Sequence, residues 1–449
     1  MFVLRVWWFL GATTLLFAFA PACRAQANRM NAPLVDHHQH LLSSAAAALI
    51  NALDGPKAAQ TTVPPDILDL LTRRAATWDD AQALAEMHAP NALVSIRSTT
   101  IQGATAVSTT LAKSFRSAYR FQVVASHVSG TTAQLSAYLV RGEGSGVSYF
   151  GVAALSLSKA PDGRWLFDSE SLQFPGPRAY SPTGAADLVA LMDAADVRRS
   201  VVLSMAYVFG TPLAPPQTDE QAKVRAENDW TATEAARFPD RLIPFCSLNP
   251  LKDYAISELE RCVRQQRMRG LKLHFANSDV DLRRAEHVQH LCAVFAAANR
   301  LHVPIVAHVW RAGGNYGAAD IRIFIDQVLP CAPNIVVQIG HMAGAGPGWT
   351  DEALKVFADA ISAGDARTGN LYFDVATVAD DQPPERLQIL ASRIRQIGVQ
   401  RILYGSDAAF GGRKTANEEW GTFRGMVPLT DAEFRTIGDN VAPYLLNSR

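Results

Sequence analysis

Residues 270–308 read GLKLHFANSDVDLRRAEHVQHLCAVFAAANRLHVPIVAH and contain one complete unit of the fold. Apolar runs at 270–275 and 303–308 have the length of buried strands, and the segment at 283–300 repeats its apolar residues with a helical period. A strand, a helix and a second strand in this order favour a parallel sheet, because the helix carries the chain back to where the next parallel strand begins. This stretch therefore predicts a β–α–β unit.

The same alternation extends along most of the chain. Six more apolar runs are predicted to be strands: 33–40, 198–205, 241–248, 334–341, 370–375 and 400–407. Five more segments with a helical period lie between them: 183–195, 219–237, 252–268, 350–363 and 384–397. Eight strands that alternate with helices predict an α/β fold, the closed (β/α)8 TIM barrel.

Residues from about 50 to 175 interrupt this rhythm. The segment 64–88 predicts amphipathic helices, and alternating polar and apolar residues over 120–174 predict an antiparallel sheet with tight turns. We therefore expect an inserted α+β domain at 60–176, after the first barrel strand. The barrel itself is expected to comprise residues 28–50 and 177–449.

Three segments of this insert carry a resemblance: WDDAQALAEMHAPNALVSI at 78–96, IQGATAV at 101–107 and Gly-Arg-Trp at 163–165. They resemble the SnoaL-like family, the cone-shaped domains also called nuclear-transport-factor-two-like. The resemblance implies an apolar interior and pairing through the sheets, so we expect a lid at the barrel mouth or a homodimer through the inserted domain. In a competing interpretation the insert is a binding module and carries the function. Its visible polar candidates are His88, His127, Arg97, Asp80 and Tyr138.

The first 27 residues have one early cation at Arg5, an apolar run, and small residues at Ala25 and Ala27. This pattern is typical of a secretory signal peptide that is cleaved after Ala27 or Ala25. Cys23 stands where the cysteine of a lipoprotein would, but the residues before it match a lipid-attachment motif poorly. We therefore expect an exported, periplasmic protein with no lipid anchor and no membrane span after processing.

The composition excludes some classes of function. Lys plus Arg and Asp plus Glu balance at 42 each among 449 residues, which gives no basic surface for nucleic acid. Four cysteines follow the predicted signal peptide: Cys246, Cys262, Cys292 and Cys331. They are far apart and form no C-x-x-C pair, so a cysteine zinc site is not expected. In a chain of this size we favour buried free thiols over disulfides.

Residues 35–41, VDHHQHL, form the first predicted strand. Alternate side chains of a strand share a face, so Asp36, His38 and His40 point one way and His37 points the other. Two imidazoles on one face near the carboxyl end of a strand can chelate one metal ion. A histidine cluster without a metal is the other interpretation of this motif alone.

Other predicted strands end in residues of the same chemical types: Lys272 and His274, His308, His341, and Asp407. The active sites of TIM barrels lie at the carboxyl ends of the strands. Because several strands present such residues at this one end, we expect a metal site rather than isolated structural histidines.

Four motifs follow one another along the chain: D-x-H-x-H at 36–40, His308, His341 and the Gly-Ser-Asp sequence that ends at Asp407. With them the chain resembles the amidohydrolase superfamily, in particular the amidohydrolase-related branch that includes aminocarboxymuconate-semialdehyde decarboxylase. The resemblance implies that His38, His40 and His308 bind a divalent metal, with zinc as our expectation. It implies that Asp407 is a further ligand able to accept a proton, and that His341 orients the attacking water and the developing oxyanion.

Several residues around this centre keep more than one interpretation. In binuclear members of the superfamily a lysine in the position of Lys272 is carboxylated and bridges two metals, whereas in mononuclear members it contacts substrate; we favour one ion. His274, Trp310 and Arg311 are candidates for substrate binding, because Arg can clamp a carboxylate with two parallel bonds. Asp36 is a candidate for fixing the tautomer of a ligand imidazole from behind, and the other interpretation is a carboxylate at the start of a strand without that role.

These residues predict an enzyme that acts on a small molecule. Our main interpretation is a metal-dependent hydrolase that attacks an amide, ester or lactone bond with metal-activated water. Asp407, His341 and Lys272 are its candidate catalytic residues. The alternative is the non-oxidative decarboxylation of an aromatic or muconate-type acid, because the same ligand set serves both reactions in this branch.

Overall fold

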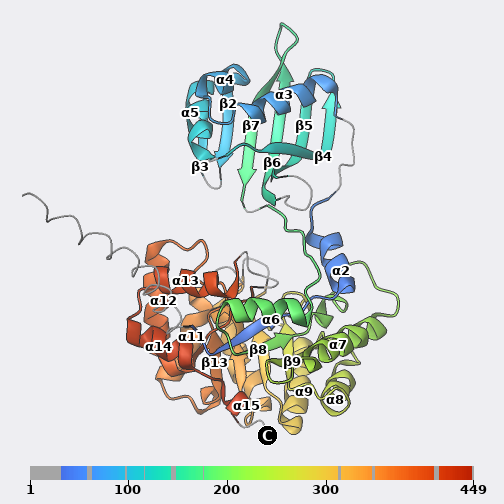
Figure 1. Ribbon diagram of the computed structural model, residues 1–449, viewed down its shortest axis with the longest axis vertical. Helices are drawn as coiled ribbons and strands as arrows, with labels where there is room; N and C mark the ends of the chain where they lie inside the picture. Colours follow the sequence, from blue (N-terminus) through green and yellow to red (C-terminus); the bar gives the residue numbers. More distant parts are fainter. Residues whose placement is uncertain are drawn as a thin grey trace, which may run out of the picture. The chain divides into compact units, whose positions relative to one another are not determined.

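The computed structural model describes residues 32–57, 63–96, 99–115, 117–142, 148–174, 176–311, 315–345, 349–408 and 414–446. The predicted signal peptide at 1–27, with Cys23, and the insert residue Arg97 lie outside these residues. The chain divides into two compact units, one formed by residues 48–180 and the other by the rest of the chain (Figure 1).

The larger unit is built on one sheet of eight parallel strands in the order β1-β8-β9-β10-β11-β12-β13-β14. Their bounds are β1 Val35–His40, β8 Arg199–Leu203, β9 Leu242–Ser247, β10 Gly270–His274, β11 Ile305–His308, β12 Val337–Ile339, β13 Leu371–Asp374 and β14 Ile402–Leu403. Two backbone hydrogen bonds join the last strand region to the first, from His37 N to Tyr404 O and from Asp407 N to His38 O. The predicted (β/α)8 barrel is confirmed.

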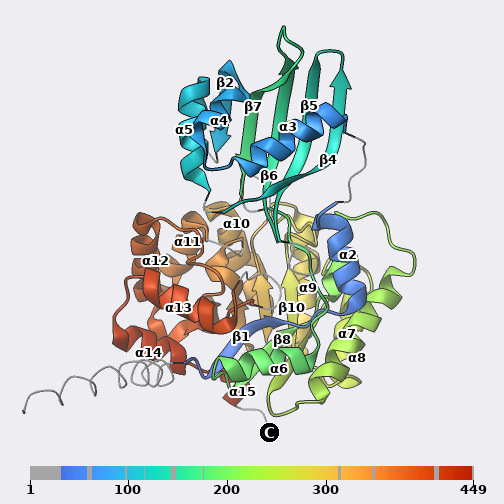
Figure 2. The same cartoon turned by 45° about the horizontal axis from the view of Figure 1, so that its top comes forward.

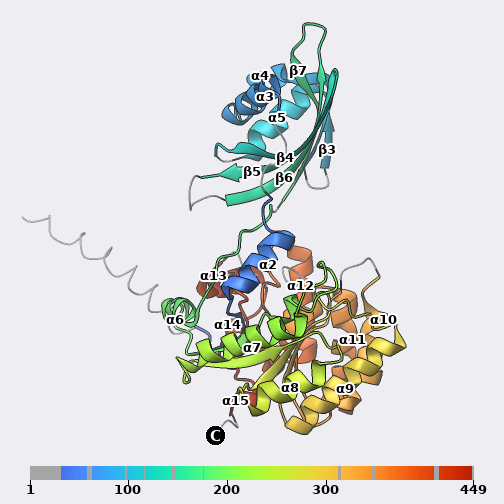
Figure 3. The ribbon, with the colours of Figure 1, turned by 90° about the vertical axis from the view of Figure 1, so that its right-hand side faces the viewer.

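Helices cover the outside of this sheet (Figures 2 and 3). They are α6 Ala185–Ala194, α7 Glu220–Ala236, α8 Ala255–Arg264, α9 Ala285–Leu301, α10 Ala318–Ile323, α11 Asp351–Ser362, α12 Pro384–Ile397, α13 Ala416–Met426, α14 Asp431–Asp439 and α15 Pro443–Leu446. A further helix, α2 (Ser44–Asp54), follows β1. Large apolar side chains such as Phe295, Phe324 and Phe357 are fully buried between helices and strands. Their burial removes apolar surface from water and holds the barrel strands in register.

The smaller unit lies between β1 and β8 in the chain and has its own core, as the predicted inserted α+β domain requires. Its sheet has the order β3-β2-β7-β6-β5-β4, and α3, α4 and α5 lie on one side of it (Figure 3). The elements are α3 Pro65–Ala76, α4 Ala81–Glu86, β2 His88–Ile96, β3 Thr99–Gln102, α5 Ala104–Ser114, β4 Arg120–Ser129, β5 Thr132–Arg141, β6 Ser148–Lys159 and β7 Trp165–Gln173. The pair β2–β7 is parallel and the other pairs are antiparallel, so the sheet is mixed.

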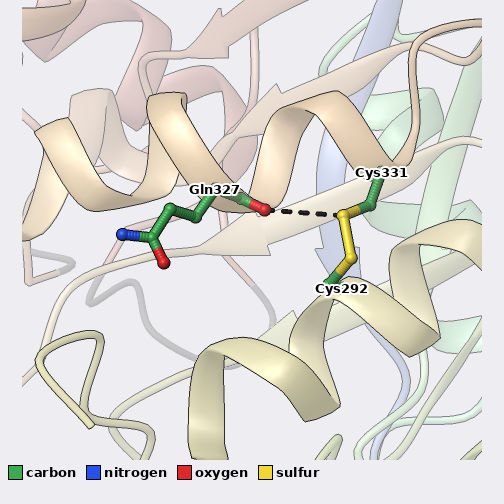
Figure 4. The surroundings of a disulfide bond; sticks show 3 residues. All are labelled: Cys292, Gln327 and Cys331. Atoms are coloured by element: carbon green, nitrogen blue, oxygen red, sulfur yellow. Dashed lines mark hydrogen bonds between the residues drawn. A yellow bond between two sulfur atoms is a disulfide. The ribbon is translucent and has the colours of Figure 1, made fainter. Parts of the chain in front are cut away.

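The expectation of free cysteines is wrong for one pair. Cys292 on α9 and Cys331 form a disulfide, with Cα atoms 5.4 Å apart (Figure 4). The sulfur of Cys331 also lies 3.4 Å from the carbonyl oxygen of Gln327. Cys246 and Cys262 are free and buried, as expected. The bond joins α9 to the end of the segment that follows α10.

Among the described residues, the search for helices long and apolar enough to cross a membrane finds none.

Candidate active site

Four imidazoles meet at the carboxyl end of the barrel strands. The ring centroids of His38 and His341 are 4.5 Å apart, those of His341 and His308 are 4.6 Å apart, and those of His308 and His274 are 4.3 Å apart. They come from β1, β10, β11 and the turn after β12. Strands that are distant in sequence thus bring their last residues together, as the fold predicts.

Three of the predicted ligands form one group, which we call the ligand trio: His38, His40 and Asp407. One ligand atom from each lies within 4.8 Å of those of the other two, and all three side chains are buried. The shortest of these approaches that involves a carboxylate is 3.6 Å, from His40 Nε2 to Asp407 Oδ1. His308 lies next to this trio, in ring contact with His341 and His274, but is not part of it.

Hydrogen bonds define which imidazole nitrogens carry a proton. His40 Nδ1 lies 2.8 Å from the carbonyl oxygen of Leu203, and His308 Nε2 lies 2.8 Å from that of Gly344. A carbonyl oxygen can only accept, so these nitrogens donate, and each neutral ring keeps a lone pair on its other nitrogen. The nitrogens that keep a lone pair are therefore Nε2 of His40 and Nδ1 of His308.

Burial keeps these rings neutral. It lowers the pKa of His40, His274 and His308 well below the usual value, and the positive charges of Lys272 and neighbouring histidines lower it further. For His341, burial and the charge of His38 lower the pKa to about 3. A metal ion binds the neutral form of imidazole, so the histidines are ready to act as ligands at neutral pH.

The hydrogen bonds of His341 define which of its ring nitrogens faces Asp407. Its Nδ1 donates to Ala376 O over 2.9 Å, so Nε2 carries the lone pair and faces Asp407 Oδ2 at 4.0 Å. A neutral His341 therefore accepts a proton at Nε2. That His341 orients the attacking water and the developing oxyanion stays a prediction; with this tautomer the ring can donate from Nε2 only after it has gained a proton there.

Asp374 is a site residue that the sequence analysis did not single out. Its Oδ2 lies 3.0 Å from His38 Nδ1, and its Oδ1 accepts from the backbone N of His341 over 2.9 Å. Burial opposes ionisation of this carboxyl, but the charge and hydrogen bond of His38 and the charge of His341 hold its pKa well below the usual range. The available signal was a carboxylate at the end of an apolar strand, NLYFDV, at the same barrel end as the ligands.

Asp36 was expected to fix the tautomer of an imidazole, and this expectation is wrong, because Asp374 makes that contact. Asp36 accepts hydrogen bonds from the backbone N of His38, from Gln39 Nε2, and from both the N and the Oγ of Ser406. Burial raises the pKa of Asp36 to about 6, although these hydrogen bonds oppose the rise. The residue thus joins β1 to the chain after β14, next to Asp407.

Lys272 is buried on β10, and its Nζ lies 3.1 Å from His38 Nε2. Burial lowers the pKa of this amine to about 8, although Asp374 and Asp407 attract its charged form. A lysine whose pKa is close to neutrality is partly deprotonated, and the neutral amine is the form that reacts with carbon dioxide. Lys272 therefore fits both predicted roles, a carboxylated lysine that bridges two metals and a lysine that contacts substrate.

The three predicted substrate-binding residues, His274, Trp310 and Arg311, differ in the residues that they contact. Arg311 pairs with Asp281, Nη1 to Oδ1, over 2.7 Å, so its charge is already compensated. The ring of Trp310 lies 6.3 Å from that of His308, and His274 lies 5.0 Å from Tyr207, a buried aromatic residue that the sequence analysis missed. His274 is thus part of the imidazole cluster and Trp310 borders it, whereas Arg311 belongs to an ion pair.

The polar candidates of the inserted domain make separate contacts. His88 is buried against Glu170, whose carboxylate also binds Arg74. Asp80 caps the start of α4, the hydroxyl of Tyr138 accepts from the backbone N of Lys57, and His127 is exposed on β4. These four side chains are not brought together as a site.

Comparison with known proteins places the larger unit in a family. The sequence model described as Amidohydrolase matches residues 176–440, more than half of the chain. A search of curated proteins finds no match. Similar solved structures include 2,6-dihydroxybenzoate decarboxylase from Rhizobium (19% identity, 56% of this chain and 84% of the other, TM-score 0.40). Another is 5-carboxyvanillate decarboxylase from Sphingomonas paucimobilis (18% identity, 56% of this chain and 79% of the other, TM-score 0.39).

Proposed function

Because this chain belongs to the amidohydrolase family, we propose that it is a metal-dependent hydrolase that cleaves an amide, ester or lactone bond of a small organic molecule. The observation that carries the proposal is the ligand trio, in which His38, His40 and Asp407 converge at the carboxyl end of the barrel. A cluster of neutral, buried imidazoles beside a carboxylate is costly to maintain without a function, since its groups are removed from water.

The donor set fits a divalent ion of the zinc type. Nε2 of His38 and of His40 would hold it with a carboxylate oxygen of Asp407, and Nδ1 of His308 is the further ligand that we propose. Imidazole nitrogen with one carboxylate oxygen suits zinc and neighbouring transition metals better than calcium or magnesium. When bound, such an ion lowers the pKa of water and polarises the bond under attack.

The protein's own groups then handle the proton. Asp407 Oδ1 and Oδ2 lie 3.6 Å from His40 Nε2 and 4.0 Å from His341 Nε2, so this carboxylate stands between a ligand and a proton acceptor. We propose that Asp407 takes the proton of the attacking water and returns it to the leaving group. Between these two steps the same proton can pass from Asp407 to the neighbouring Nε2 of His341, and the charged ring then donates to the oxygen on which negative charge develops until the proton returns to the leaving group.

Substrate contacts are proposed for the residues that border the imidazole cluster. Lys272 and His274 on β10 and the ring of Trp310 would line the substrate. Arg311 would take part only by exchanging Asp281 for a substrate carboxylate, a bidentate partner of the same kind.

Decarboxylation of an aromatic or muconate-type acid is the second candidate. The buried amine of Lys272 favours it, because a cation within the site can hold a substrate carboxylate next to the metal. The two reactions make different demands on this lysine: in a hydrolase with two ions it would be carboxylated, and in a decarboxylase it would stay a free amine.

Metal analysis of the purified protein tests the proposal most directly. We expect one ion per chain, and two ions would support carboxylation of Lys272. Loaded with zinc or manganese, the protein is then assayed with chromogenic esters and cyclic amides, and separately for carbon dioxide release from aryl carboxylates. His38→Ala should abolish turnover, whereas His290→Ala, on the exposed side of α9, should not. Equal turnover in both variants would refute the proposed site.

We further propose that the protein is exported to the periplasm. The disulfide Cys292–Cys331 supports this, because structural disulfides persist in oxidising compartments and are rare in the cytosol. The SnoaL-like identity of the inserted domain and its role as a lid or dimerisation module remain proposals; its separate core and its sheet covered on one side by helices support them.

A further inference from the structure

A continuous row of hydrogen bonds runs from residues 441–446, which we call the C-terminal segment, to His38 of the ligand trio. Tyr444 OH donates to Gln338 Oε1 over 2.7 Å, and Gln338 Nε2 donates to Asp374 Oδ2 over 2.8 Å. The same oxygen lies 3.0 Å from His38 Nδ1. We call Tyr444, Gln338 and Asp374 the positioning chain. Its members come from α15, β12 and β13 and meet only in the folded barrel.

Every polar atom of Gln338 has a partner, and the partners define which way its amide points. Oε1 accepts from Tyr444, while Nε2 donates both to Asp374 and to the backbone oxygen of His37 over 3.1 Å. Turning the amide over would place Oε1 against two groups that only accept, the carboxylate of Asp374 and the carbonyl oxygen of His37. These two acceptors fix the amide with its N–H group toward Asp374, and the hydroxyl of Tyr444 holds it there by donating to Oε1.

Asp374 connects the oriented amide of Gln338 to the proposed metal ligand His38. Its Oδ2 accepts from Gln338 and faces His38 Nδ1, while its Oδ1 accepts from the backbone N atoms of His341 and Ala376. An ionised carboxylate only accepts, so in the neutral form of His38, the form that binds a metal ion, the proton lies on Nδ1. The lone pair of His38 is then on Nε2, the nitrogen that faces Lys272 and the interior of the site.

His37, the histidine that strand geometry turns away from the trio, gives the C-terminal segment a second attachment. Its Nδ1 donates to Tyr404 O over 3.0 Å, and its Nε2 accepts from the backbone N of Ala442 over 3.1 Å. Two residues of the C-terminal segment, Ala442 and Tyr444, are thus bonded to neighbours of His38 in sequence and in space. The burial of His37 and Gln338 shields these bonds from water.

We propose that the C-terminal segment is a positioning element of the metal site: through Tyr444, Gln338 and Asp374 it holds the tautomer and direction of His38 and so sets the affinity for the metal. This inference rests on the proposed metal site but not on the reaction catalysed there. Partners that stand behind a metal-bound histidine typically contribute about 10–100-fold to metal affinity. The positioning chain extends such a contact to Tyr444, five positions before Arg449.

The test compares metal affinity, measured by competition of zinc between the protein and a chromogenic chelator, in three variants. Asp374→Asn should bind zinc about 10–100-fold more weakly. Tyr444→Phe removes one hydroxyl and should weaken binding about 3-fold, in the range of one neutral hydrogen bond. Tyr254→Phe is the matched control. It also loses a hydrogen bond from a tyrosine hydroxyl to a side chain, that of Glu220, but this residue is not a member of the positioning chain. The zinc affinity of this variant should equal that of the wild type.

A second readout does not depend on metal. In ¹⁵N NMR of the imidazole groups, His38 of the metal-free protein should be the Nδ1–H tautomer. Asp374→Asn should move its signals toward a mixture of tautomers. Tyr444→Phe should shift the Nδ1 signal, because Gln338 and Asp374 are then held less firmly, while Tyr254→Phe should leave the His38 signals in place. Unchanged zinc affinity and unchanged His38 signals in folded Tyr444→Phe would overturn the inference. Wild-type protein that binds no divalent metal would overturn both the inference and the proposed function, whereas zinc binding without any turnover would overturn the proposed function alone.

Discussion

Replacing Gly405 by alanine tests the close packing behind His38. A Cβ at this position would lie 2.7 Å from His38 Cβ and 3.3 Å from Asp374 Cβ. Carbon atoms in contact are normally about 3.5–4.0 Å apart, so the first contact would be too short by roughly 1 Å. Both opposing atoms belong to short, buried side chains on β1 and β13, so relief requires movement of the strands. We expect the free energy of unfolding to fall by about 1–3 kcal/mol, the usual cost of overpacking.

The same movement should displace His38 and weaken metal binding. Urea unfolding of the metal-free protein measures the first effect, and competition with a chelator measures the second. Gly421→Ala on α13 is the control, because nothing lies within 4 Å of the added Cβ, and alanine in a helix is about 0.5–1 kcal/mol more favourable than glycine. If Gly405→Ala were as stable as the wild type and bound zinc with the same affinity, the packing argument would be refuted.

Three further results are expected. Asp407→Asn should reduce zinc affinity by more than the roughly 100-fold upper range for residues behind a ligand, as seen in metal content after dialysis. Cys292→Ala combined with Cys331→Ala should lower the free energy of unfolding by about 2–4 kcal/mol, because the disulfide closes a loop of 39 residues. Burial opposes ionisation of Glu170, but Arg74 outweighs it and lowers the pKa to about 2, so its contribution to stability should be complete above pH 4.5 and be lost as the pH falls toward 2. Acid unfolding of Glu170→Gln should lack this step.

The barrel could be predicted because its signals are local. Apolar runs and helical periods need only neighbouring residues, and the predicted strand at 270–275 is β10, Gly270–His274. Two predicted strands extend too far at their carboxyl ends, where the candidate site lies. The run at 334–341 gives only Val337–Ile339, because the backbone at His341 has a φ of 52° and leaves the sheet. The strand predicted at 400–407 likewise ends at Leu403, before Asp407, which also has a φ of 52°.

Contacts between distant residues could not be predicted in this way. The side chains of His38 and His40 share a face because they are two residues apart, which the sequence shows directly. The bond between His38 and Asp374 joins residues 336 positions apart, and nothing near either residue indicates the other. Two other pairs depend in the same way on how separate helices and loops pack: Arg311 with Asp281, and Cys292 with Cys331.

A strained turn at the site depends on such contacts between distant residues. His341, Met342 and Ala343 have positive φ angles in succession, a conformation that costs about 1–3 kcal/mol for each residue without a glycine's freedom. Such a turn persists only where other bonds hold it. These bonds include His341 N to Asp374, His341 Nδ1 to Ala376 O, and Tyr316 OH to Ala343 O. Asp374 therefore stabilises the turn with one oxygen and orients His38 with the other. Since one carboxylate serves both, a change at Asp374 should disturb the ligand and the proton acceptor together.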